Sequence, residues 1–258
     1  MKDLYNGQAF YENGVGTGEN SPAKRGIGNA NGYGIERRLI TMMNLLQTYL
    51  RDHPGEPVDI IGFSRGAASA RVFANMLEKK SPCVKIRFLG LFDTVAQIGV
   101  PNEFNYQFGY DLSVNVNLIG FTAHAVAQNE YRSLFPLTSI SSMYDQGFLL
   151  TSVFGPAEYS PDEFMEISGC NYWEKPFAGA HSDIGGGYQN TRNLTALTWM
   201  ISEGQAAGAP FKNLSSYANF QQLVDLSAGA KPGPHDSRYW WDPYDWGSQS
   251  RVIFPGIN

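Results

Sequence analysis

Short apolar runs alternate with longer amphipathic stretches in the first part of the chain. Apolar side chains recur at helical spacing over residues 35–52, and His-Pro-Gly at 53–55 ends that predicted helix. Residues 58–63 and 85–92 are short apolar runs typical of buried parallel strands, and residues 67–80 between them predict a helix rich in small side chains. This order of elements predicts an α/β fold with right-handed crossovers and a mostly parallel central sheet.

The pattern is less regular in the middle of the chain. Residues 12–34 are rich in Gly and Asn and predict a long loop. Residues 97–117 are rich in Asn, Phe and Tyr and predict a surface insertion, which we expect to form a lid over about 97–160. The run AHAVAQNEYRSL at 123–134 predicts a helix.

Regular elements are predicted again in the last third. Residues 165–169 and 172–180 predict the last strands, and HSDIGGG at 181–187 predicts a Gly-rich turn. Residues 194–207 predict a further helix, and the chain is rich in turn residues from 229 onward. Neither a repeat nor a linker divides the chain, so we expect one domain over residues 1–258.

Composition narrows the class of protein. Hydrophobic residues make up 43% of the 258 residues and aromatic residues 14%, which excludes a disordered chain. The net charge of −5 argues against a nucleic-acid partner. Cys83 and Cys170 cannot form a disulfide scaffold and lack the spacing of zinc ligands, although one bridge between them stays open.

The sequence also bears on membrane association. Residues 1–10 lack the basic and apolar regions of a signal peptide, and the longest uncharged stretch, 112–129, carries polar groups that a spanning helix would bury at high cost. We therefore expect a soluble protein, either cytoplasmic or exported by a dedicated secretion system.

The strongest chemical motif is Gly62-Phe63-Ser64-Arg65-Gly66 between a predicted strand and a predicted helix. A G-x-S-x-G in this context predicts a nucleophile elbow, a strained turn that exposes the Ser hydroxyl. The backbone N–H of Arg65 would then point into the oxyanion site. The alternative is an ordinary Gly-rich turn in which Ser64 caps the next helix.

A nucleophilic Ser requires a base, and four histidines are available. His53 lies at a helix end and His124 in a predicted helix, where a solvated and a packed side chain are expected. His181 lies where a strand meets a Gly-rich turn, the usual place for a catalytic His on a loop. His235, in a Pro-rich turn, is the second candidate.

An orienting acid must contact that base, and two residues qualify. Asp93 ends the strand after the elbow helix, so it is predicted at the same sheet edge as Ser64. Asp183 lies two residues beyond His181, where it could equally cap the turn. We favour Asp93 and keep Asp183 as the alternative.

Five segments together resemble one family: GFSRGAASAR at 62–71, FLGLFDTVA at 88–96, AHAVAQNEYR at 123–132, FAGAHSDIGGGY at 177–188 and PHDS at 234–237. This uncharacterised α/β-hydrolase family includes the phospholipase effectors of bacterial type VI secretion. The resemblance implies an α/β-hydrolase fold and a triad of Ser64, Asp93 and His181, the residues that the local pattern favours.

The chain departs from the family at its start. Family members usually open with a strand carrying Asp-Gly-Thr before a loop similar to ENGVGTG at 12–18. Here either the sheet lacks that strand or the sequence is truncated. The second oxyanion donor is therefore expected to be the backbone N–H of Val15 or Gly16.

Two other functions compete with a serine hydrolase. His181, Asp183, His235 and Asp236 could hold a divalent ion that activates water. A binding module without catalysis could instead use two groups of aromatic residues: Phe104, Tyr106, Phe108, Tyr110, Trp240, Trp241 and Trp246. Neither alternative accounts for the elbow.

The sequence thus predicts a serine esterase that forms an acyl-serine intermediate and needs no metal and no cofactor. The resemblance implies that the substrate is a lipid ester such as a glycerophospholipid. It also implies transient contact with a membrane surface. We expect no nucleic-acid partner.

Overall fold

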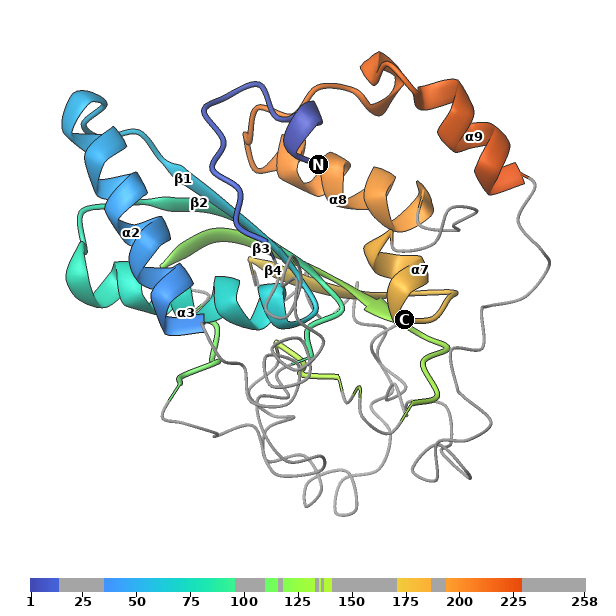
Figure 1. Cartoon of the computed structure of the whole chain (residues 1–258), viewed down its shortest axis with the longest axis horizontal. Helices are drawn as coiled ribbons and strands as arrows, with labels where there is room; N and C mark the ends of the chain where they lie inside the picture. The colour runs from blue at the N-terminus through green and yellow to red at the C-terminus, as the bar shows by residue number, and fades with distance from the viewer. Residues whose placement is uncertain are drawn as a thin grey trace, which may run out of the picture.

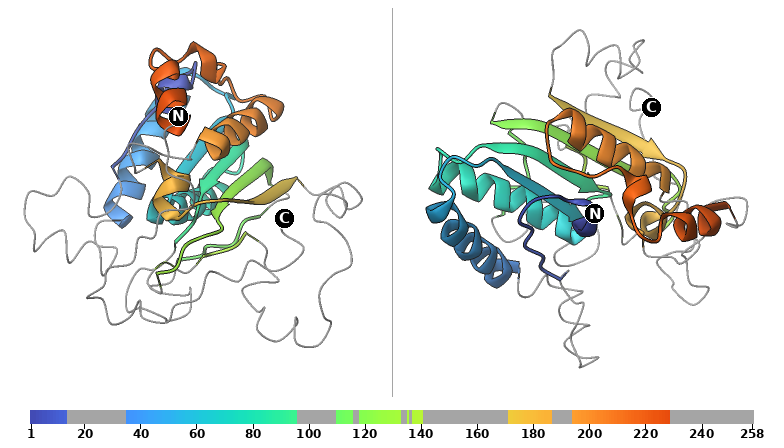
Figure 2. Two further views of the ribbon diagram at one scale, coloured as in Figure 1. Left: turned by 90° about the vertical axis from the view of Figure 1, so that its right-hand side faces the viewer. Right: turned by 90° about the horizontal axis from the view of Figure 1, so that it is seen from above.

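The computed structural model describes residues 1–13, 35–95, 110–115, 118–132, 135, 137–140, 171–186 and 194–228. In these residues a parallel sheet lies between two layers of helices, so the chain has an α/β fold (Figures 1 and 2). The four strands of the described sheet are β1 (Val58–Phe63), β2 (Ile86–Phe92), β3 (Ile119–Ala127) and β4 (Tyr172–Phe177). They follow the order β1-β2-β3-β4.

All three pairings between these strands are parallel. The carboxyl ends of the strands therefore meet at one edge of the sheet, where Phe63, Phe92 and Ala125 are neighbours in register. In open α/β sheets this edge is where ligands bind.

One face of the sheet is covered by α2 (Ile35–Asp52) and α3 (Arg65–Lys80) (Figure 2). Helix α2 buries one side through residues spaced by a helical turn, among them Leu39, Met43 and Leu46. Helix α3 packs on β1 and β2 through small and apolar side chains at its buried positions: Ala67, Ala68, Ala70, Ala74, Val72, Phe73 and Leu77.

The other face is covered mainly by α8 (Leu194–Ala206), with the short helix α7 (His181–Gly185) at its end (Figure 1). Phe88, Met200 and Phe211 lie in the core on this side. The remaining described helices are the 3-10 turns η1 (Lys2–Leu4) and η3 (Leu214–Ser216) and helix α9 (Phe220–Ala228).

The N-terminal segment packs against this second face. Leu4 is buried, and Tyr5 forms an isolated antiparallel bridge with Phe211. The Tyr5 hydroxyl donates to the Asp59 carboxylate of β1, which also pairs with Arg87 of β2. No strand precedes α2 within residues 1–13, so the described sheet begins with β1.

The structure confirms most of the predicted elements. Helix α2 and strand β1 have the expected bounds, and β2, α3, β4 and α8 lie within a few residues of theirs. Most of the loop predicted over 12–34, the strand predicted over 165–169 and the turn-rich region from 229 onward lie outside the described residues, as does most of the expected lid at 97–160.

Two predicted elements are wrong. The expected helix at 123–134 is instead strand β3, which ends at Ala127 and is followed by a turn. Its small and apolar residues are buried between β2 and β4, and periodicity alone cannot separate such a run from a buried helix. The expected turn at 181–187 begins with helix α7, closed by Gly186 in the left-handed conformation.

None of the helices in the described residues combines the length and apolar character that crossing a membrane requires.

Candidate active site

Ser64 lies in the strained turn between β1 and α3. Its backbone has φ 59° and ψ −127°, and Asp93 is the only other residue besides glycines with positive φ in the described part of the chain. Such a conformation costs a side-chain-bearing residue roughly 1–3 kcal/mol and persists only where its surroundings hold it. The turn after β1 therefore has the strained backbone at Ser64 that a nucleophile elbow would require.

The two glycines of the motif differ in their surroundings. A Cβ on Gly62 would lie 2.4 Å from the Gly66 carbonyl oxygen and 2.6 Å from the Cα of Ala67. Helix α3 can therefore approach β1 only because residue 62 has no side chain. A Cβ on Gly66 would meet no atom of the described residues within 4 Å, so close packing requires only the first glycine.

Backbone hydrogen bonds connect this turn to the residues after β2. The Ser64 N–H donates to the Phe92 carbonyl at 2.9 Å, and the Ser64 carbonyl accepts from Val95 at 3.4 Å. The same carbonyl accepts from Ala67 at 3.0 Å in the first turn of α3. The positions of Ser64 and Asp93 are thus coupled through the main chain.

Ser64, Asp93 and His181 lie in one hydrogen-bonded chain. The Ser64 Oγ is 2.8 Å from the His181 Nε2, and the His181 Nδ1 is 2.6 Å from the Asp93 Oδ2. Asp93 is completely buried and His181 is 4% exposed. Because a carboxylate can only accept, His181 carries its hydrogen on Nδ1, and its Nε2 is left to accept the Ser64 hydroxyl proton.

Main-chain contacts fix the Asp93 side chain from β3. Its second oxygen, Oδ1, accepts from the Ala127 N–H at 2.8 Å, and its own N–H donates to the Ala125 carbonyl at 2.7 Å. One carboxylate oxygen is therefore held by the sheet while the other contacts His181.

His181 is the first residue of α7, and its ring packs between two aromatic rings. The Phe63 ring lies 4.6 Å from it and the Phe135 ring 5.0 Å, measured between centroids. Gly185 makes room for Phe63, since a Cβ there would lie 2.2 Å from its ring. The imidazole is thus confined to the plane in which its two nitrogens face Ser64 and Asp93.

Glu130 holds the backbone of the same histidine. Its Oε2 accepts the His181 N–H at 3.1 Å, and both of its oxygens accept from Arg132 at 2.8 Å. Burial alone would raise the pKa of the Glu130 carboxyl, but the charge and hydrogen bonds of Arg132, together with the His181 N–H, outweigh burial and lower that pKa. The Arg132 guanidinium also lies 3.6 Å from the centroid of the Phe135 ring.

Asp183, the alternative acid, has a different partner. Its Oδ2 accepts the Ala180 N–H at 2.8 Å at the start of α7, the position of a capping carboxylate. The carboxylate within hydrogen-bond distance of the His181 Nδ1 is that of Asp93.

The other predicted residues are distributed as follows. Arg65 follows Ser64 as the first residue of α3, where burial, and then the nearby charge of Arg38, lower the pKa of its guanidinium. His53 is exposed and stacks on Tyr49 beyond the end of α2. His124 is completely buried in β3. Val15, Gly16, His235 and Asp236 lie outside the described residues, as do the predicted aromatic groups except Tyr110.

Sequence reasoning missed Glu130, Arg132 and Phe135. The signal that could have found them is the acidic and basic pair two residues apart directly after the run AHAVA. It was hidden because that run was interpreted as a helix, which would have pointed these side chains in different directions.

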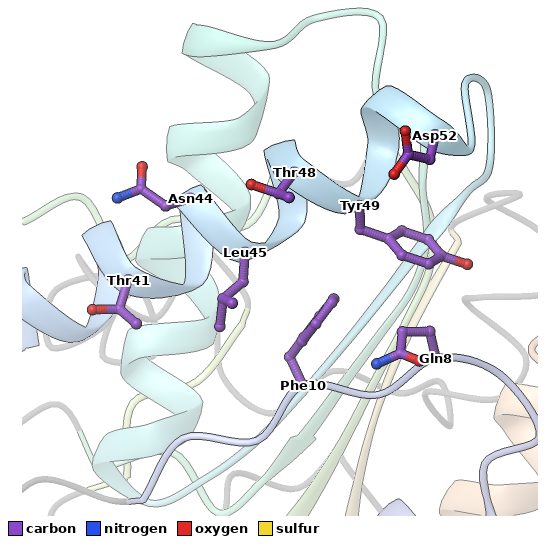
Figure 3. Close-up of a pocket in the computed structure, with 8 residues that line it drawn as sticks. All are labelled: Gln8, Phe10, Thr41, Asn44, Leu45, Thr48, Tyr49 and Asp52. Atoms are coloured by element: carbon purple, nitrogen blue, oxygen red, sulfur yellow. The ribbon is translucent and has the colours of Figure 1, made fainter.

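Within the described ranges, no three His, Cys, Asp or Glu side chains gather as a metal site. A groove of about 520 Å³ lies between the N-terminal segment and the outer side of α2, where Phe10, Leu45 and Tyr49 face it (Figure 3). Its lining does not include Ser64, Asp93 or His181.

Comparison with known proteins identifies the family. Residues 2–81 and 78–203 match the family model described as the type VI secretion phospholipase effector Tle1-like catalytic domain. The chain belongs to this family. The match to the Tle1-like family covers both the elbow and His181, and it agrees with the resemblance of the five sequence segments.

Solved structures similar to this Tle1-like chain are larger proteins. One is an uncharacterized protein from Pseudomonas aeruginosa, with 25% identity, a TM-score of 0.43 and coverage of 84% of this chain and 34% of that one. Another is the Tle1 effector bound to the VgrG spike of the type 6 secretion system, with 31% identity, a TM-score of 0.34 and coverage of 50% and 24%. The chain therefore spans about a third or less of these proteins. No curated protein is significantly similar to it.

Proposed function

We propose that the protein is a serine hydrolase that cleaves carboxylic esters of lipids, with phospholipids as the substrate class. The observation that carries the proposal is the continuous hydrogen-bond chain from the Ser64 hydroxyl through His181 to the buried Asp93. Membership of the Tle1-like phospholipase effector family supports the choice of a lipid ester. The strained backbone of Ser64 supports its role as the nucleophile.

The reaction follows from the hydrogen positions in this chain. The Ser64 Oγ attacks the ester carbonyl while the His181 Nε2 takes its proton, and Asp93 stabilises the imidazolium that forms. The tetrahedral intermediate then expels the alcohol, which receives the proton from His181, and an acyl-serine remains. Water, deprotonated by His181, releases the fatty acid in the same way and restores Ser64.

The negative charge of the tetrahedral intermediate requires hydrogen-bond donors. We assign one to the backbone N–H of Arg65, which directly follows the nucleophile at the start of α3. The N–H of Val15 or Gly16 remains our proposal for the second donor. The family also supports export by type VI secretion and transient contact with a membrane surface.

Replacing the nucleophile tests the proposal. Ser64→Ala should lower the turnover of phospholipid in phosphatidylcholine or phosphatidylglycerol vesicles by at least about 10⁴-fold, because only binding and oxyanion stabilisation remain. The variant should stay folded, since the hydroxyl is not a core group. A fluorophosphonate should add one phosphonyl group to the wild type and none to the variant.

Ser216→Ala is the matched control. Ser216 is exposed in η3, and its hydroxyl donates to the nearby Asn213 carbonyl, so its loss should leave both turnover and labelling unchanged. Wild-type turnover by a folded Ser64→Ala protein would end the proposal. Activity on short acyl esters with none on phospholipids would retain the serine mechanism and move the substrate class to simple esters.

A further inference from the structure

A second histidine–carboxylate pair contacts Thr94, the residue that follows Asp93 of the proposed triad. His124 of β3 and Glu174 of β4 are neighbours in register, and the His124 Nδ1 is 2.8 Å from the Glu174 Oε2. The His124 side chain is completely buried and that of Glu174 is 5% exposed. The hydrogen bonds of the described residues do not join either residue to Ser64 or His181.

The second ring nitrogen of His124 contacts the residue after Asp93. The His124 Nε2 lies 3.0 Å from the backbone nitrogen of Thr94 and 3.0 Å from its Oγ1. A backbone N–H can only donate, so the Nε2 must be unprotonated and accept it. The hydrogen of the neutral ring is therefore on Nδ1, from which it is donated to Glu174.

Glu174 determines this arrangement. Its carboxylate also accepts from the Ser139 hydroxyl at 2.8 Å and from the Ile140 N–H at 2.9 Å. Burial alone would raise the pKa of the Glu174 carboxyl, but its hydrogen bond and electrostatic interaction with His124, together with these two hydrogen bonds, outweigh burial and lower it. An ionised carboxylate cannot donate, so it requires a hydrogen on the facing His124 nitrogen.

The Thr94 peptide determines where the Asp93 carboxylate points. Asp93 has φ 41°, a left-handed conformation that a residue with a side chain adopts only when its neighbours hold it. The peptide that follows it is held on both sides, because the Thr94 N–H donates to His124 and the Thr94 carbonyl accepts from Thr138 at 2.9 Å. Without the contact to His124, the turn loses the acceptor for its buried N–H.

We propose that His124 is a positioning residue for the acid of the triad, held in the required tautomer by Glu174. The inference rests on the proposed function, since it gives Asp93 the role of orienting His181. Glu174 accepts from the His124 Nδ1 and so fixes the ring, and the His124 Nε2 accepts the Thr94 N–H. The fixed Thr94 peptide then keeps Asp93 at hydrogen-bond distance from His181. A histidine that only filled the core would stabilise the fold without affecting catalysis through Asp93.

Two substitutions separate the nitrogens of His124. In His124→Gln the side-chain oxygen reaches the level of Nε2 and can still accept the Thr94 N–H. In His124→Asn the amide reaches only the level of Nδ1, so it can contact Glu174 and not Thr94. We expect His124→Asn to lower kcat on the order of 10²-fold with little change in KM, since a misplacement of about 1 Å suffices for such a loss. His124→Gln should recover most of kcat.

A double mutant tests whether His124 acts through Asp93. In the Asp93→Asn background, His124→Asn should cause no further loss of kcat, because no carboxylate remains to be positioned. Turnover is expressed per mole of folded protein, determined from the thermal melt of each variant, which removes the effect of misfolded protein. Thr122→Val, at a completely buried position of the same strand as His124 whose hydroxyl has no hydrogen-bond partner among the described residues, should retain kcat and serves as the control.

Either of two outcomes would overturn the inference. One is that His124→Asn lowers kcat equally in the wild type and in the Asp93→Asn background, and the other is that His124→Asn and His124→Gln lower kcat equally. If His124→Asn does not fold, ¹⁵N NMR of the wild type decides, since the inference requires a protonated Nδ1, an unprotonated Nε2 and a coupling from Nε2 to the Thr94 N–H. A protonated Nε2 would end it. Wild-type activity of Asp93→Asn would point instead to a failure of the proposed function.

Discussion

Two buried aspartates lie near the first turn of α7, and their hydrogen-bond partners give them different tasks. Asp93 contacts the His181 Nδ1 through one oxygen and the Ala127 N–H through the other. Asp183 accepts the Ala180 N–H. An amide in place of the first would present its NH₂ group to a ring nitrogen, whereas an amide in place of the second keeps the oxygen that its partner needs.

Asp93→Asn should therefore lower turnover on the order of 10⁴-fold with little change in melting temperature. The oxygen of the new amide accepts the Ala127 N–H, so its NH₂ group donates to the His181 Nδ1. The ring hydrogen of His181 is then on Nε2, and this nitrogen can no longer accept the Ser64 proton. Steady-state kinetics and thermal melts on the purified variant measure both effects.

Asp183→Asn is the matched comparison, and it should retain turnover to within roughly ten-fold, because the side-chain oxygen still caps α7. The reverse pattern would make Asp183 the acid and leave Asp93 as a structural residue.

At the level of elements, the site depends on how closely α3 approaches β1. The atoms nearest to a Cβ on Gly62 all belong to the backbone of α3, so they cannot move without shifting the helix. Gly66 has open space in the described residues and lies within the helix. The two glycines of one motif should therefore respond differently to the same substitution.

Gly62→Ala should destabilise the fold by about 1–3 kcal/mol, as overpacked sites do, and should lower turnover because the elbow moves with α3. Gly66→Ala should leave the free energy of unfolding unchanged or raise it by up to about 1 kcal/mol, since Ala is the better helix former. Urea denaturation of both variants measures these changes. Equal destabilisation would mean that the second glycine also meets a close neighbour.

Across the whole molecule, buried carboxylates connect segments that are distant in the sequence. Glu174 connects β4 to β3 and to residues 139–140, and Glu130 connects the turn after β3 to α7. The pKa of each carboxyl is lowered in the folded protein, because its hydrogen-bond donors outweigh burial. At a pH between the pKa of these carboxyls in the folded protein and their pKa in the unfolded chain, the unfolded chain binds more protons than the folded one.

The stability contributed by these groups is complete above the unfolded pKa of about 4.3 and is lost as pH falls through it towards the folded values. We expect the free energy of unfolding to decrease between about pH 5.5 and 3.5. Glu174→Gln should show a smaller decrease, because the neutral amide binds no proton. Chemical denaturation at a series of pH values measures the difference, and identical pH dependence in both proteins would contradict the role of Glu174.

Local pattern was sufficient to predict the unit formed by β1, α3 and β2. Its strands are short apolar runs, its helix has small residues on the buried side, and the elbow requires particular residues at consecutive positions. The same unit carries Ser64 and Asp93 at the carboxyl ends of neighbouring strands, so both were found as candidates. His181 was identified as the candidate base because the sequence contains few histidines that could take this role.

Contacts between distant residues decided the rest. The partners of His181 lie 88 and 117 residues away in the sequence, and no local pattern could tell whether Asp93 or Asp183 would reach it. Strand β3 is a strand because β2 and β4 bury it on both sides, although its short apolar run suits a helix equally well. The pairing of His124 with Glu174 exists only through the register of that same sheet, since neighbouring strands bring together residues that the chain keeps far apart.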